Sequence, residues 1–195
     1  MENRLNHERL VGTLKAMGRV GVGADGKRSR LALSDGDKQA RDLLCSWIRE
    51  AGLELKVDAI GNIFGVLPGT EDGDPVFAGS HIDTVPDAGM FDGCVGVLSG
   101  LEALRTIAEK GLPHRRSLAV AALTNEEGSR FLPGTMGSMV MEGLLSLEDA
   151  RRSRDKDGFT VGAELDRIGY AGNDALHPRA FMELHVEQGP YLDAE

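Results

Sequence analysis

The sequence LAVAALTNEEG at residues 118–128 joins a continuous apolar run to a polar end. Six apolar residues in a row are typical of a strand that is buried on both faces at the centre of a sheet. Two adjacent glutamates, Glu126 and Glu127, follow closely after the run. Because open α/β sheets place ligand sites at the carboxyl ends of their strands, the stretch predicts a central strand with a site at its end. A solvated charged loop is the alternative for the two glutamates.

The segments around this stretch alternate between helical and extended patterns. Apolar residues recur at helical spacing, which predicts helices, over residues 6–17, 37–51 and 93–110. Further strands are predicted over residues 53–59, 62–67, 76–80 and 181–186. Residues 141–180 are polar and rich in glycine, and they predict short helices and loops. Strands that alternate with helices indicate an α/β fold around a sheet.

The composition limits the class of protein. The chain has 195 residues, of which 41% are hydrophobic and 27% charged, which is typical of one globular domain. Its net charge of −9 argues against nucleic acid as a partner. The N-terminus lacks the apolar run of a signal peptide, and no apolar stretch could cross a membrane. Cys45 and Cys94 form no CxxC pair, so we expect a cytoplasmic protein with no membrane partner.

Two further polar clusters follow a predicted strand or open a predicted helix. In GSHIDTVP (79–86), His81 and Asp83 stand two residues apart on an extended segment and point the same way. The imidazole could then bind a metal through one nitrogen while the carboxylate fixes the ring through the other, although a structural histidine is the alternative. In FDGCVG (91–96), Asp92 is either a helix N-cap or a carboxylate that bridges two metal ions.

The glutamate pair and the segment ELHVEQGP (183–190) complete the polar clusters. Two like charges at one site indicate a metal or a raised pKa, and one carboxylate can hold a metal while its neighbour acts as general base. Strand alternation would place Glu183, His185 and Glu187 on one face, toward either water or a site. The neighbouring Gln188 and the glycine after it favour the site.

Together these segments resemble a known family. GSHIDTVP with FDGCVGVLSGLEAL, LTNEEGSRF with GTMGS, and ELHVEQGP are similar, in order and spacing, to the signatures of the hydantoinase/carbamoylase branch of the dinuclear-zinc M20-type peptidases. Residues 58–62 match the DxxGN pattern of that branch, which includes N-carbamoyl-L-amino acid hydrolases, allantoate amidohydrolases and β-ureidopropionases. The resemblance implies the N-terminal half of a zinc-peptidase-like catalytic domain, with a central mixed sheet flanked by helices.

The resemblance also implies a role for each matching metal ligand. His81 and His185 correspond to ligands of the first metal ion, and Asp92 to the carboxylate that bridges both ions. Glu127 corresponds to a ligand of the second ion. Two divalent ions are therefore expected. Zinc suits this mixture of imidazole and carboxylate, and manganese, cobalt or nickel are compatible with the same donors.

The remaining matches concern catalysis. Glu126 corresponds to the general base, Asp83 to the residue that orients the metal-binding imidazole, and Gln188 to a contact with the substrate amide. The resemblance implies hydrolysis of a linear amide, an N-carbamoyl-L-amino acid or a ureido compound such as allantoate or ureidopropionate. The nucleophile would be a metal-bound hydroxide, which forms when Glu126 removes a proton from a bound water molecule.

The resemblance covers only part of the family's pattern. After HVEQGP, family members carry a lid and dimerisation domain, and then a return to the catalytic sheet that supplies a last histidine and a substrate-binding arginine. The 195-residue sequence has no candidate for these, so we expect residues 1–195 to be the N-terminal part of the catalytic domain, with the lid absent and homodimers expected of full-length relatives. The alternatives are an inactive truncated fragment with a partial metal site, and a metallopeptidase of the same superfamily, against which HVEQGP argues.

Overall fold

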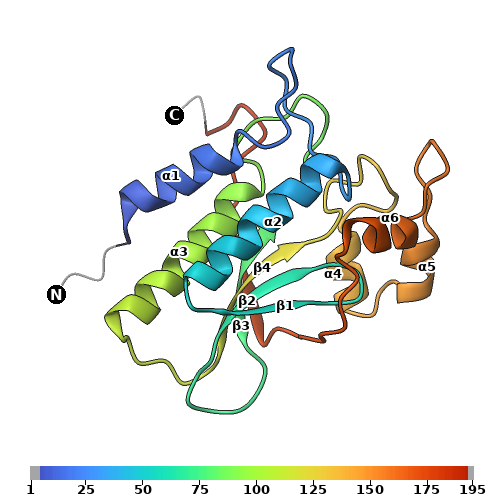
Figure 1. The fold of residues 1–195 in the computed structure, drawn as a ribbon. Helices are drawn as coiled ribbons and strands as arrows, with labels where there is room; N and C mark the ends of the chain where they lie inside the picture. The colour runs from blue at the N-terminus through green and yellow to red at the C-terminus, as the bar shows by residue number, and fades with distance from the viewer. Residues whose placement is uncertain (1–4, 193–195) are drawn as a thin grey trace.

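A mixed five-stranded sheet lies at the centre of the molecule (Figure 1), and the expected α/β class is confirmed. The computed structural model describes residues 5–192, so the first four residues of the N-terminal stretch and the last three of the chain lie outside the described residues. The strand order is β1-β2-β4-β3-β5. Strand β2 is antiparallel to β1 and β4, whereas β3 is parallel to β4 and β5. The strands are β1 Glu54–Val57, β2 Ile63–Leu67, β3 Val76–His81, β4 Leu118–Leu123 and β5 Ala180–Met182.

Three long helices cover one face of the sheet (Figure 1). They are α1 His7–Met17, α2 Asp35–Glu50 and α3 Cys94–Lys110. The side chains of Asn6 and Ser34 accept hydrogen bonds from the first turns of α1 and α2, which satisfies backbone donors there. Helix α3 ends at Gly111 in the left-handed conformation (φ 58°), which glycine adopts readily at the end of a helix.

Three short helices follow β4, and two of them lie within residues 141–180, where the sequence predicts short helices and loops. They are α4 Met136–Met141, α5 Leu147–Arg152 and α6 Val161–Ile168, joined by loops. Among the described residues, no helix is long and apolar enough to cross a membrane.

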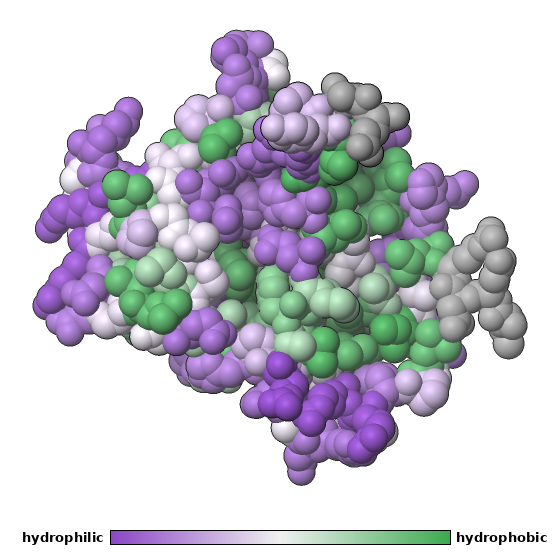
Figure 2. Space-filling view, turned by 180° about the vertical axis from the view of Figure 1, so that it is seen from behind, coloured by the Kyte–Doolittle hydropathy of each residue, from purple (hydrophilic) through white to green (hydrophobic). Residues whose placement is uncertain are grey.

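The two faces of the sheet differ in how they are covered. Along β4, Val120 and Ala122 join the large core beneath the long helices, whereas Ala119 and Ala121 belong to a smaller cluster on the other face. The alternation follows from the two-residue period of a strand. Figure 2 views the molecule from behind, where apolar surface is open to solvent between polar margins. The long helices bury one face, and on the opposite face the central side chains Phe64 and Phe77 are also fully buried.

The predicted strand over residues 181–186 is wrong in its extent. Strand β5 stops at Met182, and residues 183–188 have no regular structure. Its pairing with β3 ends at Ala78, while the chain beyond turns toward the start of α3: a Cβ atom on Gly96 would lie 2.7 Å from the Leu184 carbonyl oxygen. Contact with the helix replaces pairing with the sheet, so the expected single face of Glu183, His185 and Glu187 does not form.

Candidate metal centre

Four ionisable side chains meet because of where their elements end. His81 is the last residue of β3, and Glu126 follows β4 by three residues. These strands are parallel and pair from Val76–Leu118 to His81–Leu123, so they end at the same edge of the sheet. Asp92 precedes α3, and His185 follows β5, which runs parallel to β3. The topology therefore directs all four to one edge, as expected for a site in an open α/β sheet.

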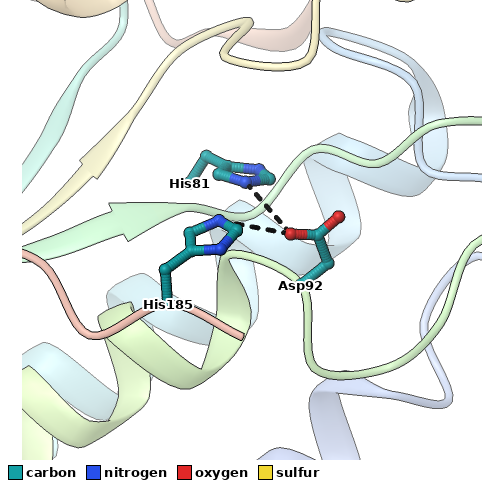
Figure 3. A group of neighbouring side chains, drawn as sticks. All are labelled: His81, Asp92 and His185. Atoms are coloured by element: carbon teal, nitrogen blue, oxygen red, sulfur yellow. Dashed lines mark ion pairs between the residues drawn. The ribbon is translucent and has the colours of Figure 1, made fainter. Parts of the chain in front are cut away.

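Three of these side chains form a close group (Figure 3). The candidate ligand atoms of His81, Asp92 and His185 all lie within 4.8 Å of one another. Asp92 Oδ1 is 3.7 Å from His81 Nε2 and 3.3 Å from His185 Nε2. The two imidazole rings stack with their centroids 5.9 Å apart. The structure thus brings together two histidines that are 104 positions apart in the sequence (185 − 81).

Each imidazole is oriented by a backbone carbonyl on its far side. His81 Nδ1 is 2.9 Å from the carbonyl oxygen of Asp83, and His185 Nδ1 is 2.9 Å from that of Val186. In the neutral rings, a proton on Nδ1 donates to these carbonyls and leaves the lone pair of each Nε2 pointing at Asp92. The contact with Val186 also raises the pKa of His185. A charged imidazole paired with Asp92 is the other protonation state that this geometry allows.

The oxygen at the centre of the group has no hydrogen-bond donor. Asp92 Oδ1 is buried and accepts no hydrogen bond, while Oδ2 accepts one from Gln188 Nε2. A buried carboxylate oxygen without a partner is costly. Two imidazole nitrogens and one carboxylate oxygen are the donors that zinc and similar divalent ions prefer. These residues therefore fit a metal ion, and they are the one group of three or more such ligands found among residues 5–192.

A glycine is required for Asp92 to approach His81. Gly93 has a φ of 61°, in the left-handed region that disfavours other residues. A Cβ atom there would lie 2.5 Å from the carbonyl oxygen of His81 and 2.6 Å from its Nε2. The glycine thus permits both the turn into α3 and the close contact between the two metal-ligand candidates.

Asp83 orients His81 in a different way from the sequence prediction. Its carbonyl oxygen contacts the ring, whereas its carboxylate oxygen Oδ1 is 3.7 Å from His81 Nδ1. The carboxylate instead accepts the backbone N–H groups of Glu126 at 3.2 Å and Glu127 at 3.4 Å. Burial raises the pKa of the Asp83 carboxyl, and the nearby His81 opposes this effect. Asp83 therefore connects the end of β3 to the glutamate pair.

The two glutamates differ in their surroundings. Glu126 Oε2 lies 3.4 Å from His81 Nε2, and its side chain is 35% exposed, so it can exchange protons with water. Glu127 Oε1 accepts the backbone N–H of Val85 at 3.3 Å. Burial raises the pKa of Glu127 above its ordinary value, although the nearby His81 opposes part of this effect. The structure places Glu126 beside the three-residue group and directs Glu127 toward the loop that precedes Asp92.

The loop that carries the glutamates is fixed from within. Asn125 has a φ of 52°, and its side-chain amide donates to the carbonyl oxygens of Phe131 and Pro133 at 2.9 and 3.0 Å. Backbone hydrogen bonds from Thr135 to Glu126 and from Met136 to Asn125 close the loop. Asn125 was not predicted as a functional residue. Its residue type was the available signal, because asparagine adopts the left-handed backbone conformation more often than most residues.

A buried ion pair also supports this loop and was missed in the sequence. Arg41 Nε donates to Asp37 Oδ2 at 2.7 Å, with side-chain exposures of 2% and 0%. The same guanidinium donates to the Gly61 carbonyl oxygen and to Thr124 Oγ1. Burial disfavours the charge of Arg41, but Asp37 outweighs it and the pKa is raised. The i, i+4 spacing on α2 was the available signal, but such pairs are usually exposed.

The segment 183–190 contributes unequally to the site. Glu183 accepts a hydrogen bond from Ser80 Oγ, at the end of β3. Glu187 accepts the backbone N–H groups of Tyr191 and Leu192, so it faces its own turn and not the metal-ligand group. The expected substrate contact, Gln188, donates to Asp92.

Comparison with known proteins connects this geometry to a family. The sequence profile of Peptidase family M20/M25/M40 matches residues 77–195. An N-carbamoyl-L-amino-acid amidohydrolase of Rhizobium meliloti is 44% identical over 98% of the chain and 47% of its own length. A ureidoglycolate hydrolase of Oryza sativa is 37% identical over 86% of the chain and 37% of its own length.

Solved structures agree with these relatives. A hydantoinase/carbamoylase family amidase from Burkholderia ambifaria matches with a TM-score of 0.93 and 44% identity, over 97% of the chain and 47% of that protein. The chain thus spans about half the length of the relatives that it matches. The resemblance to the hydantoinase/carbamoylase branch is confirmed, and so is the match to the N-terminal half of its members.

Proposed function

The chain belongs to Peptidase family M20/M25/M40, and from this premise we propose that residues 1–195 are the N-terminal part of the catalytic domain of a metal-dependent amidohydrolase. Its substrates would be N-carbamoyl-L-amino acids or related ureido acids, which are cleaved at a C–N bond that is not a peptide bond. The observation that carries the proposal is the unpartnered Asp92 Oδ1 between His81 Nε2 and His185 Nε2. The names of the relatives support the substrate class.

His81, His185 and Asp92 would hold the first metal ion, and Asp92 with Glu127 would contribute to a second. When bound, the ions would polarise the carbamoyl carbonyl and lower the pKa of a bound water molecule. His81 and His185 would keep their Nε2 lone pairs available because each Nδ1 donates to a backbone carbonyl. Gln188 would release Asp92 and donate its amide N–H to the substrate's carbonyl oxygen.

Glu126 would act as general base and then as general acid. Its carboxylate adjoins His81 and is open to water, so it can accept a proton from the attacking water. The oxygen attacks the carbamoyl carbon, the bond from that carbon to the amino-acid nitrogen breaks, and Glu126 returns the proton to the departing nitrogen. The products are the free amino acid and carbamic acid, which decomposes to ammonia and carbon dioxide. Asp83 would hold Glu126 in place through the backbone N–H.

The cellular setting is also part of the proposal. Cys45 and Cys94 are both buried and free. Unpaired thiols suit a reducing compartment, which supports a cytoplasmic reaction on a small molecule.

A chimera tests the function. Residues 1–195 would replace the matching 47% of the Rhizobium meliloti amidohydrolase, and ammonia release would be measured with N-carbamoyl-L-amino acids and ureidoglycolate. We expect turnover in the chimera and a loss of about 10²–10⁴-fold in its Glu126→Gln variant, with metal content unchanged. A folded, metal-loaded chimera that releases no ammonia would contradict the proposal, and so would a Glu126→Gln variant with a near-normal rate.

The 195-residue chain alone should behave differently. Among the described residues, only Asp92 and Glu127 remain for a second ion, which is too few ligands for tight binding. We expect it to bind one equivalent of zinc by calorimetry and to release no ammonia. Turnover on the order of 1 per second would show that the described residues already form a complete site.

A further inference from the structure

A hollow of about 530 Å³ lies directly beside Asp92, and the proposed metal site forms one end of it. Its walls are the loop 85–92 and residues 186–188. Asp92 and Gln188 belong both to the hollow and to the metal-ligand group. A substrate whose ureido group reaches that group therefore extends its remaining atoms toward the hollow. Its volume is in the range of small-molecule sites in proteins.

Several side chains that line the hollow are both apolar and exposed. Val85 is 36% exposed and Phe91 49% exposed, although both are large hydrophobic residues. Met90 and Val186 line the same space. A group of exposed apolar side chains around a polar site is typical of a ligand-binding surface, because an apolar ligand covers them and removes them from water.

The wall formed by residues 85–92 is held in position without a ligand. The backbone N–H of Ala88 donates to the Arg28 carbonyl oxygen at 2.9 Å, and Arg28 Nη1 donates back to the Ala88 carbonyl oxygen at 3.0 Å. At its start, the backbone N–H of Val85 donates to Glu127. A Cβ atom on Gly18 would lie 3.1 Å from Met90, so the methionine packs against the end of α1. The wall is therefore preformed, so binding a ligand costs little conformational entropy in residues 85–92.

The charges around the hollow are acidic. The ionisable residues in its lining are Asp87, Asp92 and Glu187, and it contains no lysine, arginine or histidine. Lys27 pairs with Asp87 at 2.8 Å, and Glu187 accepts two backbone N–H groups of its own turn. A second carboxylate on the substrate would find no lysine, arginine or histidine in this lining and would lose its hydration without gaining a cationic partner.

We propose that this hollow binds the amino-acid side chain of the substrate and selects N-carbamoyl-L-amino acids with an apolar side chain. The proposal rests on the proposed function and narrows its substrate class. Phe91, Met90 and Val85 determine the specificity, and the α-carboxylate points away from the hollow. Ureido acids without an apolar side chain, such as ureidoglycolate, leave the wall exposed to water and bind less well.

Binding to the zinc-loaded chain tests this selection. Dissociation constants would be measured by NMR titration for N-carbamoyl-L-methionine, N-carbamoylglycine, N-carbamoyl-L-aspartate and ureidoglycolate. We expect methionine to bind at least about tenfold tighter than glycine, because burying each methylene group contributes free energy. We expect aspartate to bind more weakly than glycine because its second carboxylate finds no cationic partner in the lining.

A substitution in the wall should remove the preference. Phe91→Ala changes an exposed side chain and should fold; we expect it to weaken methionine binding about fivefold or more and glycine binding by much less. The matched control is Phe159→Ala, which removes a phenylalanine of similar exposure (55%) outside the hollow and should change neither.

Three outcomes would overturn the inference. They are equal affinities for methionine and glycine, preferred binding of aspartate or ureidoglycolate, and an unchanged preference in Phe91→Ala. A failure of the proposed function is distinguishable, because the chain would then bind no zinc and the chimera would release no ammonia.

Discussion

The candidate metal centre consists of two parts that are held in different ways. We call His81, Asp83, Glu126 and Glu127 the inner part and residues 183–192 the outer part. The inner part lies at the ends of two paired strands, and both His81 and Asp83 are almost completely buried, with 1% and 2% exposure. The outer part has no regular structure, and the side chain of His185 is 36% exposed.

The difference indicates what each part contributes to metal binding. In the inner part, folding alone fixes the donors through Asp83, Asn125 and the buried Arg41, so the entropy of ordering them is already lost before the metal binds. In the outer part, His185 contacts the Val186 carbonyl, Asp92 and the His81 ring, but it lies on a segment without regular structure, so more of the ordering cost falls on metal binding itself. Changes in the inner part should therefore affect stability and metal binding together, and changes in the outer part only metal binding.

The largest expected effect comes from Gly93→Ala. The added Cβ would meet His81 at 2.5–2.6 Å, and the φ of 61° disfavours alanine. We expect a loss of roughly 3 kcal/mol of unfolding free energy in urea, because strain and overpacking add. Zinc binding should fall as well, because Asp92 moves. Gly26→Ala is the control: its φ is 79° but nothing lies within 4 Å, so only about 1 kcal/mol is lost and zinc binding is retained. Equal losses in the two variants would contradict the role of the close contact.

The next prediction compares zinc binding and stability in variants of the two histidines. Both His81→Ala and His185→Ala remove a proposed ligand, so each should weaken zinc binding by more than the ~10–100-fold typical of supporting residues. In metal-free protein, His81→Ala should lose about 1–3 kcal/mol of stability because a buried ring and its hydrogen bond are removed, whereas His185→Ala should stay within about 0.5 kcal/mol. Calorimetry with zinc and urea unfolding without it separate the two effects. Similar stability losses would show that the outer part is as well fixed as the inner part.

The inner part was largely predictable from the sequence, and the outer part was not. The apolar run 118–123 and the HxD spacing depend on strand period and strand ends, which are local properties. They led to β4, to β3 and to the expected meeting of Glu126 with His81. The extent of β5 depends instead on the approach of Leu184 to Gly96, two segments that are distant in the sequence. A pattern of alternating residues carries no information about such a contact.

The supporting residues were missed for a related physical reason. Arg41 and Asp37 read as an ordinary exposed pair on a helix, but burial makes them a connection from α2 to Thr124. The spacing of His81 and Asp83 also does not reveal whether the Asp83 carbonyl, at 2.9 Å from Nδ1, or its carboxylate, at 3.7 Å, lies nearer the ring.

A smaller effect tests the support from Arg41. Thr124→Val keeps the shape of the side chain but removes the hydroxyl that Arg41 Nη2 contacts at 3.2 Å. A buried donor left without its acceptor costs about 1–3 kcal/mol, so we expect the unfolding free energy to fall by about that amount. Thr13→Val is the control, because the Thr13 hydroxyl bonds only to Leu10 in its own helix and its loss should be nearly neutral. Two near-neutral variants would show that Arg41 does not support the inner part through Thr124.

The smallest effect that we predict is a pH dependence of the inner part's support. Arg130, three residues after Glu127, donates to Glu164 at 2.7 Å, and Arg167 holds the other oxygen of the same carboxylate at 2.8 Å. The hydrogen bond from Arg167 lowers the pKa of Glu164 below its ordinary value of 4.5, although burial opposes it. Because the folded pKa is the lower one, this stabilisation is complete above pH 4.5 and is lost as the pH falls through the folded pKa.

Urea unfolding between pH 6 and pH 3 should therefore show a smaller acid-induced loss of unfolding free energy in Glu164→Gln than in the unchanged chain. Asp35→Asn is the matched control, since Asp35 pairs with the same Arg167 but is 80% exposed, and its removal should leave the pH profile unchanged. Identical profiles for the Glu164→Gln variant and the unchanged chain would show that the charge of Glu164 does not stabilise the loop that holds the glutamates.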